Sequence, residues 1–202
     1  MGGDPILSEA RDGATRAKYG GQLCSFPRAR MASEKGENMS FDKLFSSDDQ
    51  AWRTPRHVFD YFDDRFSFDL DAASSAQNAL CDRYLTIEDN ALEVDWTGLG
   101  VRSVWCNPPY GREVGKWVEK CRREADKGIR VCALVFARTD TRWWHDHIMG
   151  RARMVYLFRG RVKFGRSDTG EMKHAAPAPS CLVMWYGINI VDTYFKSVTL
   201  RK

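Results

Sequence analysis

Residues 103–137 read SVWCNPPYGREVGKWVEKCRREADKGIRVCALVFA. The stretch opens with an apolar segment that stops at two prolines. This predicts a strand over 103–109, because proline cannot continue a central strand. Apolar residues then recur with helical spacing over 114–128, and Gly128 supplies a stop signal. Residues 129–137 form a continuous apolar run, as expected for a strand buried on both faces. The stretch therefore predicts strands that alternate with helices.

Neighbouring segments extend this pattern. Thr54 and Pro55 predict a helix start, with Thr54 as N-cap and Pro55 at the first helical position, and FSFDLDAAS at 66–74 predicts another strand. Two β-rich runs, 152–165 and 180–187, end the pattern and are joined by a polar loop. The order favours an α/β sheet with helices on both faces and a C-terminal antiparallel strand pair. Ligands of such sheets bind beyond the carboxyl ends of the strands, so the DLDAAS and NPPY segments should share one rim.

Composition limits the class of protein. The chain has 202 residues, which suits one domain, and a formal net charge of +4. Residues 1–40 hold six basic and five acidic residues without hydrophobic periodicity, so we expect a disordered extension before a domain over 41–202. The sequence has no run of about 18 apolar residues and no secretory signal. Six cysteines without a C-x-x-C pair indicate reduced thiols and a cytoplasmic protein.

Charge is strongly segregated along the chain. Residues 42–95 hold 13 acidic and 5 basic residues, a net charge of −8, whereas residues 138–166 hold 8 basic and 2 acidic residues, a net charge of +6. The basic segment also carries aromatic residues, which suits phosphate contact and base stacking. The alternative explanation for these basic residues is that they lie on a strand face that contacts only solvent. In RGRVKF the basic residues alternate, which would place them on one strand face. The predicted nucleic-acid contacts are Arg138, Arg159, Arg161 and Lys163.

The tetrapeptide Asn107-Pro108-Pro109-Tyr110 suits an amine substrate. The side-chain oxygen of Asn107 and the carbonyl of Pro108 can both accept hydrogen bonds from one NH2 group. The two prolines remove backbone donors and stiffen the turn, and Tyr110 offers a flat face for a planar group. Two acceptors on its hydrogens would make an aromatic amine more nucleophilic. The alternative is a tight turn that only ends a strand.

Several motifs in order resemble one family. The motifs TP, FDLDAA, DW, NPPY, RTDT-x-WW, GRV-x-F and PS-x-L-V-x-W, within about residues 45–187, resemble the bacteriophage DNA N-6-adenine-methyltransferase (Dam) family. The resemblance implies a Rossmann-like domain that uses S-adenosylmethionine and methylates an adenine flipped out of double-stranded DNA. It implies catalytic roles for all four NPPY residues. The cofactor residues that it implies are Thr54, Pro55, Asp69, Leu70, Asp71, Ala72 and Asp95.

The chain departs in one respect from the usual pattern of methyltransferases that use S-adenosylmethionine. It has DLDAAS where those enzymes usually carry a Gly-rich turn. Two other functions stay open: an NPPY enzyme that methylates RNA adenine or protein glutamine, and a DNA-binding relative that has lost catalysis. His145-x-His147 has no clear further ligands, so we expect no metal site.

Overall fold

The computed structural model describes residues 52–166, 174–176, 178–187 and 192–200. The predicted extension over residues 1–40 lies outside them. The helices are α2 (Arg56–Phe66), η2 (Thr97–Leu99, a 3-10 turn), α3 (Val114–Asp126) and α4 (Arg142–His147). The strands are β1 (Trp52–Arg53), β2 (Leu70–Asp71), β3 (Ser103–Cys106), β4 (Arg130–Phe136), β5 (Met154–Phe158), β6 (Lys163–Arg166), β7 (His174–Ala175), β8 (Ser180–Trp185) and β9 (Tyr194–Val198).

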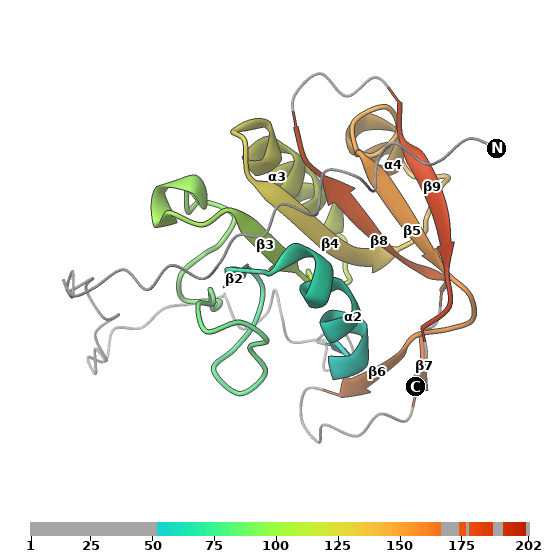
Figure 1. The fold of residues 1–202 in the computed structure, drawn as a ribbon, viewed down its shortest axis with the longest axis horizontal. Helices are drawn as coiled ribbons and strands as arrows, with labels where there is room; N and C mark the ends of the chain where they lie inside the picture. The colour runs from blue at the N-terminus through green and yellow to red at the C-terminus, as the bar shows by residue number, and fades with distance from the viewer. Residues whose placement is uncertain (1–51, 167–173, 177, 188–191, 201–202) are drawn as a thin grey trace. The chain divides into compact units, whose positions relative to one another are not determined.

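Six strands form a mixed sheet in the order β2-β3-β4-β8-β5-β9. β2, β3 and β4 run parallel, because α3 carries the chain back between β3 and β4. β8 is antiparallel to both β4 and β5, which confirms the predicted antiparallel pairing near the C-terminus. A second sheet, β1-β6-β7, is antiparallel. The protein is thus an α/β protein with a mixed sheet (Figure 1).

Alternate strand residues enter two different cores, as the period of a pleated strand requires. Val131, Ala133 and Val135 of β4 belong to the core that also contains the buried residues of α3 and Trp144 of α4. Cys132 and Leu134 face the opposite way, into the core that contains the apolar face of α2. Helices therefore pack on both faces of the sheet, as the sequence predicts (Figure 1).

The short apolar runs of the sequence map unevenly onto strands. The predicted strand over 66–74 is only Leu70–Asp71, because Phe66 ends α2 and Ser67 adopts a left-handed conformation with φ 48°. The run 152–165 contains two strands of different sheets, β5 and β6, with Gly160 at φ 86° in the turn between them. Periodicity alone does not locate such breaks, since each depends on one residue with positive φ.

A buried carboxylate ties α3 to the segment before β3. Glu124 is 1% exposed and accepts hydrogen bonds from the backbone N–H of Trp96 at 3.1 Å and from Nζ of Lys120 at 2.7 Å. Nζ of Lys127 lies 2.9 Å from the same carboxylate, and Lys120 also donates to the carbonyl of Val94. These contacts fix residues 94–96 against the C-terminal half of α3.

Among the residues that the structure describes, none of the helices combines the length and the apolar character that crossing a membrane requires.

Candidate active site

The carboxyl ends of β2, β3 and β4 lie along one edge of the sheet. Asp71 is in register with Trp105, and Cys106 is in register with Ala133. Beyond the strand pairing, the N–H of Ala72 donates to the carbonyl of Trp105 at 2.8 Å. The segments that follow the strands, which begin at Ala72, Asn107 and Ala137, therefore emerge side by side. The two motifs that the sequence placed on a common rim do share it.

Tyr110 is anchored inside this rim. Its phenol lies 2.9 Å from Oδ1 of Asn107 and 2.9 Å from the carbonyl oxygen of Leu134 in β4. A phenol has a single proton, so the two oxygens compete for one donor. Burial raises the pKa of Tyr110 well above its ordinary value, and the group stays a neutral donor. The amide oxygen of Asn107 is therefore a hydrogen-bond acceptor on the rim of the site.

The ring of Tyr110 packs among aromatic side chains that the sequence did not single out for this site. It stacks on Phe136, the last residue of β4, with centroids 4.1 Å apart and 22° between the planes. It meets Phe164 of β6 at 5.7 Å and 71°. Phe164 belongs to the aromatic basic segment, and Phe136 lies in the apolar run 129–137, but neither signal points to Tyr110. The contacts join elements that are far apart in the sequence.

Asp71 is the predicted cofactor carboxylate on the carboxyl edge. It is 2% exposed, and it accepts hydrogen bonds from the N–H of Leu80 at 3.1 Å and the N–H of Ala73 at 3.4 Å. Burial raises the pKa of Asp71 to about 6, and the two backbone hydrogen bonds partly oppose that rise. Leu70 and Ala72, its neighbours, turn into the core instead. Ser74 follows with a buried hydroxyl that has no hydrogen-bond partner among the described residues.

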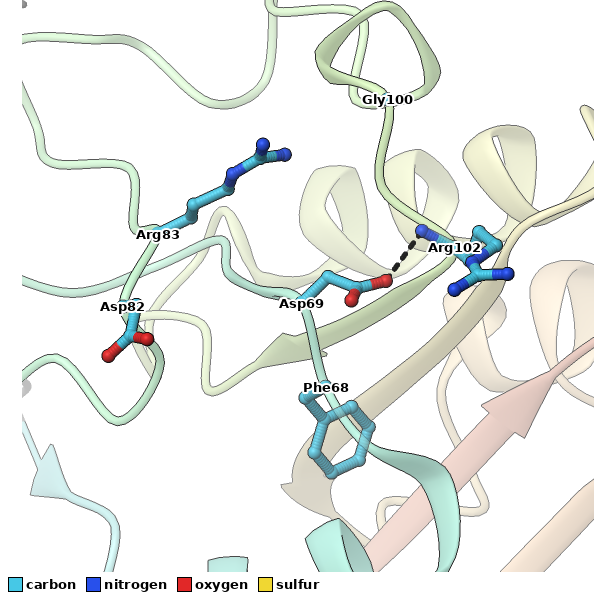
Figure 2. Close-up of a pocket in the computed structure, with 6 residues that line it drawn as sticks. All are labelled: Phe68, Asp69, Asp82, Arg83, Gly100 and Arg102. Carbon is cyan, nitrogen blue, oxygen red and sulfur yellow. Dashed lines mark hydrogen bonds between the residues drawn. The ribbon is translucent and has the colours of Figure 1, made fainter. Parts of the chain in front are cut away.

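Asp69 lies at the opposite, amino end of the strands. Its Oδ2 accepts from the N–H of Arg102 at 2.8 Å and of Ser103 at 3.0 Å, so it joins the start of β2 to the start of β3. Figure 2 shows this carboxylate pointing at the backbone of Arg102, in a pocket that Asp82 and Arg83 also line. Asp69 and Asp71 are two residues apart in the sequence, but their carboxylates lie at opposite edges of the sheet.

Asp95, a cofactor residue implied by the family resemblance, lies in a segment without a strand. Residues 86–100 contain turns and η2, and no strand lies between β2 and β3. The Asp95 carboxylate binds Nζ of Lys127 at 2.8 Å and the hydroxyl of Thr97 at 2.7 Å, and these bonds hold its pKa below the ordinary value. Lys127 follows the C-terminus of α3, just before β4 begins, so Asp95 also lies toward the amino edge.

The predicted helix start lies one residue later than expected. Pro55 is the N-cap of α2, and Thr54 makes no side-chain cap. Arg53 in β1 is in register with Gly165 of β6, next to the Phe164 that contacts Tyr110. Thr54 and Pro55 therefore directly follow a strand that borders the aromatic group of the site.

The four predicted DNA-contact residues are exposed, but they do not share one strand. Arg138 follows β4 on the carboxyl edge, and Arg159 lies beyond the end of β5. β6 begins only at Lys163, and Arg161 precedes it with its guanidinium on the carbonyl of Ala176 at 3.1 Å. The expected single row on an RGRVKF strand is therefore wrong, because Gly160 breaks the strand. Residues 167–173 and 177 of the polar loop between the two β-rich runs lie outside the described residues.

Arg112 is a further basic residue that the sequence interpretation did not include. It is exposed in the turn two residues after Tyr110. The adjacent carboxylate, Glu113, pairs with Lys116 and not with Arg112. The sequence could have indicated this residue, because a basic side chain two positions after the NPPY segment lies in the same loop.

Within the described ranges, no group of three or more His, Cys, Asp or Glu side chains is placed to hold a metal ion. His145 and His147 lie at the C-terminal end of α4, where Trp144 is a core residue.

Two phage enzymes are similar in sequence to this chain. The DNA N-6-adenine-methyltransferase from Haemophilus phage HP1 is 29% identical over 141 residues, which cover 69% of this chain and 80% of the relative. The DNA N-6-adenine-methyltransferase from Escherichia phage T1 is 32% identical over 135 residues, which cover 59% of this chain and 56% of the relative. Residues 42–201, which include every described residue, match a single family. The chain belongs to the DNA N-6-adenine-methyltransferase (Dam) family.

Proposed function

We propose that the protein is a DNA methyltransferase that transfers a methyl group from S-adenosylmethionine to the exocyclic N-6 amine of an adenine flipped out of double-stranded DNA. The observation that supports it best is the position of Asn107–Tyr110 directly after β3, beside the carboxyl end of β2. In open α/β sheets this edge is where ligands bind. Family membership supports the same reaction.

Asn107 and Pro108 have the central role in this proposal. The amide oxygen of Asn107 and the carbonyl of Pro108 each accept a hydrogen bond from the adenine amine, which donates its two N–H groups. The lone pair of the nitrogen is then less delocalised into the ring as the new bond to carbon forms. Pro108 and Pro109 keep the turn rigid, so the acceptors need no rearrangement. Tyr110 orients the base by stacking, with Phe136 and Phe164 supporting its ring.

The residues after β2 fit a cationic, hydroxyl-rich cofactor. Asp71 offers a buried carboxylate, Ala72 and Ala73 have small side chains, and Ser74 has a buried hydroxyl without a partner among the described residues. When bound there, S-adenosylmethionine would supply an electrophilic methyl group. Asp71 and Ser74 would hold its polar groups, with Thr54 and Pro55 at the neighbouring end of β1. Asp69 and Asp95 have no cofactor role in this proposal, because both carboxylates are hydrogen-bonded to residues at the amino edge of the sheet.

Exposed arginines near the edge complete the proposal. Arg112 follows Tyr110 and Arg138 follows β4, and the side chain of neither has a hydrogen bond or ion pair among the described residues. We assign them to the phosphates on either side of the flipped nucleotide, with Arg159, Arg161 and Lys163 farther along the duplex.

The test is transfer of radiolabelled methyl groups from S-adenosylmethionine to DNA, RNA and a protein lysate in separate reactions. We expect label in DNA, recovered as N-6-methyladenine after digestion. Asn107→Ala should abolish transfer while S-adenosylmethionine binding, measured by calorimetry, stays near that of the parent protein. Label confined to RNA or protein would overturn the proposed substrate. DNA binding without any label would favour a non-catalytic relative.

A further inference from the structure

Ser180, the first residue of β8, carries a hydroxyl that has no role in the proposed reaction. The residue is 2% exposed, and its Oγ makes no hydrogen bond with any described part of the chain. A buried hydroxyl without a partner has lost its bonds to water and gained none in return, so it destabilises the fold. Alanine at this position would avoid that cost. Such groups in native proteins call for a specific explanation.

Strand register places Ser180 beside the aromatic group of the site. Ser180 lies directly opposite Phe136 in the antiparallel pair of β4 and β8. Residues in such a pair project from the same face of the sheet, with Cβ atoms about 4.5–5.5 Å apart. Phe136 is the residue on which Tyr110 stacks. The hydroxyl therefore lies on the Tyr110 side of the sheet, at the same carboxyl edge of β4.

The other groups on this face cannot satisfy the hydroxyl. The next pair along the same face is Leu134 with Leu182, and both are fully buried apolar side chains. Phe136 and Phe164 add only aromatic carbon. A planar base that enters this region would thus meet apolar surface and two hydroxyls, those of Tyr110 and Ser180, which is the composition of a selective ligand site.

We propose that the Ser180 hydroxyl donates a hydrogen bond to a ring nitrogen of the flipped adenine, and that Ser180 is a specificity-determining residue. This assignment rests on the proposed function. Adenine has an accepting ring nitrogen on each side of its amine, N1 on one edge and N7 on the other. Asn107 and Pro108 accept hydrogen bonds from the amine, and one of the two ring nitrogens can accept a further hydrogen bond from the Ser180 hydroxyl. A hydrogen bond to N7 would exclude both pyrimidines, because neither has an acceptor at that position. A hydrogen bond to N1 would exclude guanine, because the N1 of guanine is a donor.

Ser103 supplies a matched control. It is 3% exposed, and its Oγ likewise has no hydrogen-bond partner within the described segments. It begins β3 at the amino edge, where its N–H donates a hydrogen bond to Asp69. It therefore lies at the far end of the strands from Tyr110. Ser180→Ala and Ser103→Ala remove the same atom from the same kind of environment. Only the first should alter recognition of the base.

The experiment measures kcat/KM for methyl transfer into synthetic duplexes that carry the site methylated by the parent protein. The target position holds adenine, 1-deazaadenine or 7-deazaadenine. With the parent protein, we expect one of the two analogues to react about tenfold more slowly than adenine because it lacks the accepting nitrogen. Ser180→Ala should show a similar loss with adenine and no further loss with that analogue. Ser103→Ala should behave as the parent protein in every duplex.

Two results would overturn the assignment. One is a Ser180→Ala variant that methylates adenine as fast as the parent protein. The other is a variant that is slower but discriminates against both analogues as the parent protein does, because the lost hydrogen bond would then not involve a ring nitrogen. Thermal melting checks folding, and neither alanine variant should melt below the parent protein. If the parent protein itself labels no DNA adenine, the proposed function fails, and the Ser180 assignment fails with it.

Discussion

The ring of Tyr110 lies against the ring of Phe136, with their centroids 4.1 Å apart. Stacked carbon atoms need about 3.5–4 Å between layers, so a base between the two rings would need roughly twice the observed separation. The phenol of Tyr110 is meanwhile hydrogen-bonded to the carbonyl of Leu134 or to Asn107. A flipped base that reaches Ser180, beside Phe136, therefore separates the two rings as it enters.

Substitutions at Tyr110 separate its ring from its hydroxyl. Tyr110→Phe keeps the ring on Phe136 and removes the contacts to Leu134 and Asn107, and we expect kcat/KM to fall less than tenfold. Tyr110→Ala removes the stacking surface, which is worth about 1–3 kcal/mol for a base, so kcat/KM should fall about 10- to 100-fold. Steady-state methyl transfer to DNA measures both. Tyr186→Ala, which changes an exposed tyrosine, serves as the control. Normal turnover by Tyr110→Ala would contradict the stacking role.

Asp71 should make the stability of the protein depend on pH. Its folded-state pKa of about 6 lies above its ordinary value of 3.8, so folding favours the protonated carboxyl. The corresponding stabilisation is complete below about pH 4 and is lost as the pH rises through 6. The loss amounts to about 3 kcal/mol, because each pH unit of difference corresponds to about 1.36 kcal/mol.

Asp71→Asn removes that titration. We expect its free energy of unfolding, from urea titrations, to change less than that of the parent protein between pH 4 and pH 6. The loss of one backbone hydrogen bond offsets part of the gain at higher pH. The exposed Asp64→Asn is the control. The same variant should bind S-adenosylmethionine more weakly, so increased stability with decreased binding is the expected signature. A pH dependence identical to that of the parent protein would refute the role of Asp71.

Local patterns in the sequence were sufficient for the central strands and α3. The apolar run 129–137 and the helical spacing after Val114 both describe short-range geometry, and the structure has β4 and α3 there. The predicted strand over 103–109 is shorter in the structure, where β3 ends at Cys106, two residues before Pro108. These features place the NPPY segment on the correct edge of the sheet.

Contacts between distant segments were not predictable in the same way. Asp69 binds the N–H groups of residues 33 and 34 positions later, and nothing in DLDAAS distinguishes its use from that of Asp71. Phe136 reaches Tyr110 only because β3 and β4 are neighbours in the sheet. Ser180 lies opposite Phe136 through a pairing of strands that are 44 positions apart in sequence. Sequence spacing carries no information on such pairings.

Glu124 should be a major determinant of stability. Glu124→Ala would leave Lys120, whose side chain is only 10% exposed, without its carboxylate partner, and would release the N–H of Trp96. Breaking a buried ion pair from one side costs about 3–5 kcal/mol. Glu113→Ala, which removes a largely exposed ion pair with Lys116, should cost less than about 1 kcal/mol. Urea unfolding of both variants tests the contrast, and equal effects would show that the buried network contributes little.

The basic side chains at the carboxyl edge should determine how DNA affinity responds to salt. A phosphate contact releases condensed counterions, so removing one contact lowers the slope of log K against log salt by about 0.9. We expect this from Arg112→Ala and from Arg138→Ala, measured by fluorescence anisotropy with a labelled duplex between about 50 and 200 mM salt. Arg123→Ala changes an exposed arginine of α3 and should leave the slope unaltered. Affinity for S-adenosylmethionine should remain the same in all three variants, because the cofactor presents no phosphate. If Arg123→Ala lowered the slope as much as the other two, the interaction would depend on overall charge and not on this edge of the sheet.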